Sequence, residues 1–103
     1  MNTRKSLLSM LHQLLREMDV VQSQGAGYYT CSPFACRLNK LITQAGRLFD
    51  GENRLMDTFE PLDEKDPKDP GDKSKVLLAI RIEIGQLIAL LEATDPGEKE
   101  ANA

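Results

Sequence analysis

Residues 76–91 have the sequence VLLAIRIEIGQLIALL, the most apolar stretch of this 103-residue chain. At helical spacing, five of its aliphatic residues follow one another at alternating steps of three and four: Leu77, Ile80, Ile84, Leu87 and Leu91. Such a repeat forms one continuous stripe down a helix, as in helical bundles and coiled coils. Further aliphatic residues lie outside the stripe, so the apolar arc is wider than the roughly 100° of an ordinary surface helix. We therefore expect this helix to be covered on several sides.

The surplus apolar surface of this helix predicts self-association. Gly85, Ala89 and Ala93 lie four residues apart and would allow a neighbouring backbone to come close. An apolar face that one small bundle cannot cover is typical of a subunit interface. We predict a homodimer whose interface is formed by the third helix, through Leu77, Ile80, Ile82, Ile84, Ile88 and Leu91.

A strand is the alternative interpretation of residues 80–84, where aliphatic and charged residues alternate with a period of two. A strand needs a partner, and only the short stretch 28–31 has comparable character. A helix is therefore favoured. The apolar stretch is shorter than the ~20 residues that cross a bilayer, and it contains Arg81 and Glu83, so we expect no membrane association.

Length and composition indicate a single small helical domain. The chain is 41% hydrophobic but only 5% aromatic, without tryptophan. A core of aliphatic side chains without aromatic anchors suits a helical bundle. The net charge of −3 argues against a nucleic-acid-binding role for the whole surface. Because no secretion signal is visible, we expect a cytoplasmic protein with reduced cysteines.

Two more helices are predicted upstream. The first covers residues 3–24, with its stripe at Leu7, Leu11, Leu14, Met18 and Val21, and Gly25-Ala26-Gly27 ends it. The second covers residues 33–60, with Ser32 as N-cap and Pro33 in the first helical position. Its stripe contains Phe34, Leu38, Leu41, Ala45 and Leu48. The same spacing continues past Gly51 to Leu55, Phe59 and Leu62, which favours one long helix. The alternative is a break at Gly51 and a short fourth helix over residues 52–59.

Prolines and acidic residues then predict an exposed linker over residues 61–72. Asp72 would cap the third helix, at residues 73–94, and residues 95–103 would form a disordered tail. Short connections between three helices predict an all-α domain over residues 1–94, an antiparallel three-helix bundle with up-down-up topology.

Cys31 and Cys36 are the first candidate for chemistry. With Ser32 as N-cap, the two cysteines occupy the positions that a hydrophobic staple joins, so their side chains are expected to be neighbours. Two small apolar side chains forming that staple are the structural interpretation. The functional alternative is a reversible dithiol, because a helix N-terminus stabilises a thiolate. Metal binding is the weaker alternative, since one pair of cysteines and the lone His12 do not form a ligand set.

A basic stripe on the second helix is the other candidate. Lys40, Arg47 and Arg54 are seven residues apart, with Arg37 nearby. This spacing would hold the four cations on one solvent-facing side, where they could contact a phosphate backbone. An ordinary solvated face is the structural interpretation.

The sequence lacks the motifs that are typical of enzymes and of nucleotide-binding proteins. No paired carboxylates, nucleophile arrangement or nucleotide-binding loop is present, so we expect neither enzymatic activity nor a cofactor. The sequence therefore favours a non-enzymatic, self-associating helical module that binds a protein partner. A nucleic-acid-binding helical protein that uses Arg37, Lys40, Arg47 and Arg54 is the alternative. A redox or metal site at Cys31 and Cys36 comes third.

Overall fold

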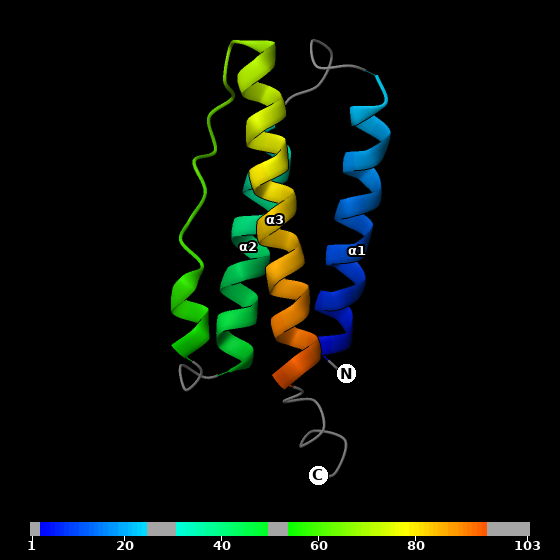
Figure 1. The fold of residues 1–103 in the computed structure, drawn as a ribbon. Coiled ribbons are helices and arrows are strands. Elements are labelled where there is room, and N and C mark those ends of the chain that lie inside the picture. Colours follow the sequence, from blue (N-terminus) through cyan, green and yellow to red (C-terminus); the bar gives the residue numbers. More distant parts are fainter. Residues whose placement is uncertain (1–2, 25–30, 50–53, 95–103) are drawn as a thin grey trace.

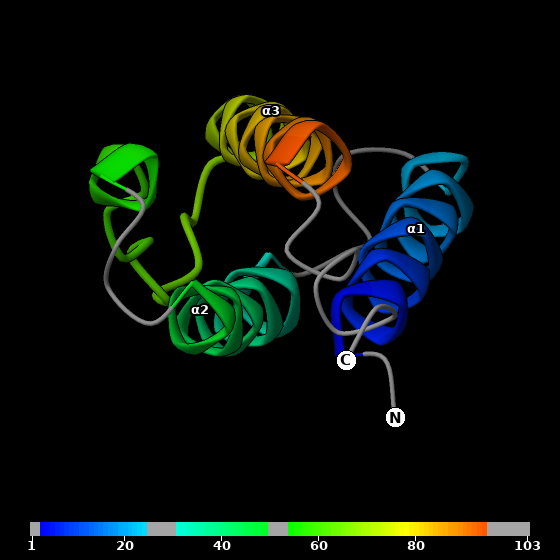
Figure 2. The same cartoon turned by 90° about the horizontal axis from the view of Figure 1, so that it is seen from below.

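The computed structural model describes residues 3–24, 31–49 and 54–94. Within these ranges the structure is all helical, with α1 at Thr3–Gln22, α2 at Ser32–Leu48, the 3₁₀ helix η1 at Arg54–Thr58 and α3 at Pro70–Thr94. None of the described residues is in a strand, so the helical interpretation of residues 80–84 is confirmed. Viewed from one end, α1, α2 and α3 occupy the corners of a triangle, and η1 lies to the side of α2 and α3 (Figure 2).

The three helices run up, down and down, so the predicted up-down-up topology is wrong. In Figure 1, α1 rises from its N-terminal end, whereas α2 and α3 both descend. Contacts agree with these directions. Arg4 Nε, in the first turn of α1, donates to the Leu91 carbonyl near the end of α3, at 2.6 Å. Cys31 Sγ, at the start of α2, lies 3.5 Å from the Lys73 carbonyl in the first turn of α3. α2 and α3 are therefore parallel to each other and antiparallel to α1.

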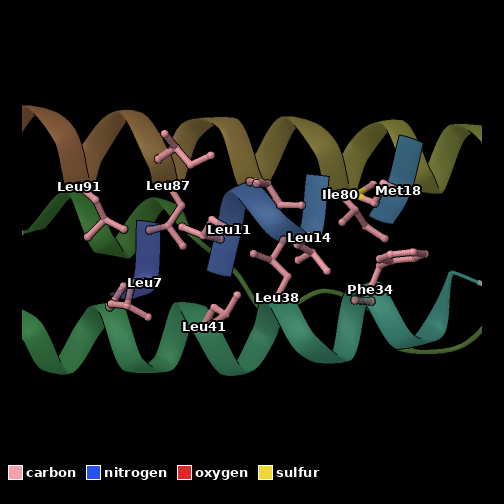
Figure 3. Packing of buried hydrophobic residues seen from close by; sticks show 14 of the residues in the cluster. Leu7, Leu11, Leu14, Met18, Phe34, Leu38, Leu41, Ile80, Leu87 and Leu91 are labelled. Atoms are coloured by element: carbon pink, nitrogen blue, oxygen red, sulfur yellow. The ribbon is translucent and has the colours of Figure 1, made fainter. Parts of the chain in front are cut away.

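The core lies between the three helices, where their aliphatic stripes meet. Leucine side chains from all three converge along the length of the bundle (Figure 3). Each predicted stripe contributes buried residues: Leu7, Leu11, Leu14 and Met18 from α1; Phe34, Leu38, Leu41 and Ala45 from α2; and Leu77, Ile80, Ile84, Leu87 and Leu91 from α3. Burial of an aliphatic or aromatic side chain contributes about 1.5–3 kcal/mol, so these stripes supply most of the stabilisation.

The N-terminus of α2 is capped from a distance. The N-cap residue is Cys31, not the predicted Ser32, and its own side chain makes no capping hydrogen bond. Instead, Asp66 Oδ1 accepts hydrogen bonds from the backbone N–H groups of Cys31 and Ser32. Pro33 has no N–H to satisfy, and the Phe34 N–H donates to the Cys31 carbonyl at 3.0 Å. The amides at this helix start are thus satisfied because a carboxylate 35 residues away reaches them.

α2 ends at Leu48, so the prediction of one helix over residues 33–60 is wrong. Phe49 is the C-cap, and its N–H donates to the Ala45 carbonyl at 3.3 Å. The next residues in the sequence are Asp50-Gly51-Glu52-Asn53, which lie outside the described ranges. Three of these four are poor helix formers, with glycine costing about 1 kcal/mol, and this outweighs a continuing aliphatic spacing. The alternative of a break followed by a short helix is closer, because η1 lies within the predicted residues 52–59.

Residues 59–69, here called the return arm, lead from η1 back to the start of α3 and account for the changed topology. In Figure 1 the arm ascends along the bundle before α3 begins. Asn39 of α2 holds its middle, because Asn39 Nδ2 donates to the Leu62 carbonyl at 2.9 Å and Asn39 Oδ1 accepts from the Leu62 N–H at 2.8 Å. The predicted linker is therefore exposed at most of its positions and is hydrogen-bonded to α2 at Leu62.

α3 begins three residues earlier than predicted. Pro70 is its first residue, and the Gly71 N–H donates to Asp69 Oδ1 at 3.3 Å. Asp69 therefore caps the helix in place of Asp72, and Pro70 occupies the first turn, where its missing N–H costs nothing. The predicted tail over residues 95–103 lies outside the described residues.

Candidate protein-interaction surface

Most of the predicted interface residues belong to the core of a single chain. Leu77, Ile80, Ile84, Ile88 and Leu91 are all buried within one copy, in the same core cluster as residues of α1 and α2. Only Ile82 remains accessible, with 55% of its surface exposed. The exposed apolar surface of α3 is smaller than the sequence indicated, because other elements of the same chain cover a broad arc of this helix. Of the predicted interface residues, only Ile82 keeps an exposed side chain.

The accessible apolar side of α3, here called the α3 outer face, consists of Leu78, Ile82, Gly85 and Ala89. All four residues are exposed, and Leu78 is 56% exposed. At 100° per residue they fall within an arc of about 60°, opposite the buried stripe. Among the described residues, no heavy atom outside the helix backbone lies within 4 Å of where a Cβ would stand on Gly85. Leu78 was not among the predicted interface residues, although it lies four residues before Ile82 and therefore on the same side of the helix.

Charged residues flank the outer face. Lys75 near the start of α3 and Glu92 near its end are both exposed. On one edge, Arg81 Nη2 forms an ion pair with Asp19 Oδ1 of α1 and donates to Gln22 Oε1 at 2.8 Å. This pair joins α3 to the last turn of α1 and fixes that edge of the outer face.

Beside the outer face, α3 borders a second apolar surface, here called the α3 groove, between α3 and the chain from η1 to the return arm. One hollow of about 320 Å³ is lined by Leu62, Asp63, Lys65, Asp66, Pro67, Val76, Ala79 and Ile80. The next, of about 520 Å³, is lined by Leu55, Thr58, Phe59, Glu83, Gln86, Ala89, Leu90 and Ala93. Ala89 belongs to both surfaces, so the outer face and the groove adjoin. Grooves of this kind accept amphipathic segments of other proteins.

The cysteines are both free and differ in environment. Cys31 is 1% exposed, and Cys36 is partly buried. Burial and the negative charge of Asp66 raise the pKa of the Cys31 thiol, and Lys73 offsets part of that rise. The protonated thiol is therefore favoured, which counts against a reactive thiolate at Cys31.

Backbone geometry also separates the two cysteines. Cys31 has near-helical dihedral angles, φ −91° and ψ −24°. Five residues of helix place two Cα atoms about 8.7 Å apart, whereas a disulfide spans less than about 7 Å. The staple predicted from Ser32 as N-cap loses its basis, since the cap is Cys31. A redox or metal role for Cys31 and Cys36 stays a prediction that this geometry does not favour.

The basic residues are divided between two elements. Arg37, Lys40 and Arg47 are exposed on α2, within an arc of about 80°. Arg54 begins η1 instead, so the predicted seven-residue repeat on one helix ends at Arg47. Arg37 also lines a hollow of about 310 Å³ between α1 and α2, together with Glu17.

Among the described residues, no group of three or more His, Cys, Asp or Glu side chains is arranged to hold a metal ion. None of the described helices combines the length and apolarity needed to cross a membrane.

Compared with protein-family models, curated proteins and solved structures, the chain matches none of them.

Proposed function

We propose that the protein is a non-enzymatic helical interaction module, which pairs with a second copy through the α3 outer face and binds a segment of another protein in the α3 groove. The observation that carries the first part is the exposure of Leu78 and Ile82 on one side of α3, next to Gly85, which none of the described residues covers. Large apolar side chains that share an exposed helix face with small residues are typical of helix–helix contacts.

The exposed area sets the expected strength of this pairing. Covering the half of Leu78 and Ile82 that is still accessible is worth about 1–1.5 kcal/mol for each side chain, or about 4–6 kcal/mol for the four in a dimer. A gain of this size is small beside the cost of association, so we expect a weak dimer that forms only at high protein concentration, in the micromolar to millimolar range.

A charge placed on the outer face tests the pairing. We expect Ile82→Glu to reduce the solution mass to that of a monomer, as measured by light scattering over a range of protein concentrations. Val20→Glu is the matched control, because Val20 is also a β-branched aliphatic residue and is 62% exposed on α1. Loss of the dimer in both variants, or a wild-type monomer at millimolar concentration, would contradict the proposal.

Binding in the α3 groove needs a separate test. Leu55 lines the groove and is 56% exposed, so a charge there should block an apolar segment without disturbing the core. Peptides selected from a random 16-residue library should lose binding to Leu55→Glu and retain it with Val20→Glu. Selection that yields no Leu55-dependent peptide would contradict this part of the proposal.

Nucleic-acid binding is the second candidate, and the exposure of Arg37, Lys40 and Arg47 on one side of α2 favours it. Contacts to phosphates would make the affinity for an oligonucleotide fall steeply with salt. Replacing Lys40 and Arg47 by glutamate should then abolish the binding. Equal binding by this variant and the wild type would exclude α2 as the contact.

A further inference from the structure

We propose that two copies pair their α3 outer faces antiparallel, about a two-fold axis that passes between the two α3 helices, level with the peptide bond between Glu83 and Ile84. This inference rests on the proposed function, and it specifies the orientation and register of the pairing. It follows from the order of side chains along the outer face. The large residues Leu78 and Ile82 come first, and the small residues Gly85 and Ala89 follow.

An antiparallel axis at this point matches large residues to small ones. It places Leu78 level with Ala89 of the partner subunit, and Ile82 level with Gly85 of the partner subunit. Because the axis is two-fold, each match occurs twice. A parallel arrangement would set Leu78 against the partner's Leu78 and would leave the small residues facing each other across a void, which loses contact energy.

Charge supports the same axis independently. Lys75 and Glu92 are exposed on the flanks of the outer face, near opposite ends of α3. Their midpoint in sequence coincides with that of the two size-matched pairs. The axis therefore brings Lys75 level with the partner's Glu92 at both ends of the contact, within reach of two long side chains. A parallel pair would instead place like charges side by side.

The register also explains Gly85. Glycine within a helix is less favourable than alanine, because it loses more backbone freedom on folding. Within residues 3–24, 31–49 and 54–94, no contact requires a glycine here, because the space around the added Cβ is open and Gly85 is exposed. In the antiparallel pair, the partner's Ile82 fills that space and lets the two helices approach closely.

Charge reversal tests the register. We expect Lys75→Glu and Glu92→Lys each to raise the dimer dissociation constant by about 5- to 30-fold at low salt, since each creates two like-charge contacts. The double variant K75E/E92K should restore the wild-type value. Glu92→Lys is the decisive variant, because it moves the net charge of −3 two units toward zero and would strengthen any dimer governed by overall repulsion.

A bulky apolar residue at Gly85 provides the second test. Gly85→Leu adds apolar surface in open space, so the chain should still fold. A dimer held by non-specific apolar contact would become stronger in this variant. In the antiparallel register it collides with the partner's Ile82 and should weaken the dimer at least tenfold. Stronger association of Gly85→Leu, or of Glu92→Lys, overturns the register. If Ile82→Glu still dissociates the dimer in that case, the proposed function stands while the register fails.

Discussion

Replacing Asn39 should show whether the return arm depends on a single amide side chain. Asn39 makes three hydrogen bonds to the arm: Nδ2 donates to the Leu62 carbonyl at 2.9 Å and to Glu64 Oε2 at 2.8 Å, and Oδ1 accepts from the Leu62 N–H at 2.8 Å. Each bond contributes about 0.5–1.5 kcal/mol net, with the exposed one to Glu64 at the low end. Asn39→Ala loses about 2–3 kcal/mol of these and regains about 0.5 kcal/mol in helix propensity.

The expected loss for Asn39→Ala is therefore about 2 kcal/mol, or roughly 8–16 °C in Tm for a domain of this size. Asn39→Asp keeps the acceptor for the Leu62 N–H but loses both donors, and it places a carboxylate against Glu64. It should cost about 2–3 kcal/mol, so the more conservative change is at least as harmful.

Urea denaturation followed by circular dichroism at one protein concentration measures both losses. Gln44→Ala, on an exposed position of the same helix, is the control and should change the free energy of unfolding by less than about 0.5 kcal/mol. If both Asn39 variants were as stable as Gln44→Ala, the arm would be held by other contacts and the argument would be refuted.

Three further predictions concern other contacts. Asp66→Ala removes the acceptor of two backbone amides at the start of α2 and should lower the free energy of unfolding by about 1–2 kcal/mol. Asp66→Asn should lower it by about half of that, and the exposed control Glu60→Ala by less than about 0.5 kcal/mol. The pKa of the Cys31 thiol in the folded chain lies above its ordinary value of 9.0, so the unfolded chain loses this proton at a lower pH than the folded chain. The free energy of unfolding, measured by urea titration, should therefore fall above pH 9, and more steeply than in Cys31→Ser. Gly46→Ala, with open space around the new Cβ inside α2, should raise the free energy of unfolding by about 0.5–1 kcal/mol; a loss would mean that Gly46 is needed for packing.

The helices and their buried stripes follow from sequence because spacing determines which side chains share a face. All five stripe residues of α3 are buried as expected, and α1 ends within two residues of the predicted boundary. Helix ends were less predictable, because capping depends on contacts that are distant in sequence. Ser32-Pro33 suggested a self-contained start for α2, whereas the acceptor is Asp66 of the return arm.

The prediction of an up-down-up topology was wrong for a related reason. The aliphatic spacing through Leu55, Phe59 and Leu62 indicated one long helix, but spacing alone does not register the low helix propensity of Asp50-Gly51-Glu52-Asn53. Once α2 ends at Leu48, the chain between the helices is long enough to return along the bundle, and α3 can run parallel to α2. The set of candidate interface residues changed as well. Of the predicted set only Ile82 is exposed in one copy, and Leu78, which was not predicted, is exposed beside it.

The most direct test of self-association through the α3 outer face is the solution mass of the unmodified chain, measured by light scattering from about 10 µM to 1 mM at low salt. We predict a mass that rises with concentration from 11.5 kDa toward twice that value and goes no further, as expected for a closed two-fold pair. A mass that stays at 11.5 kDa throughout, or that continues to grow beyond a dimer, would contradict the account.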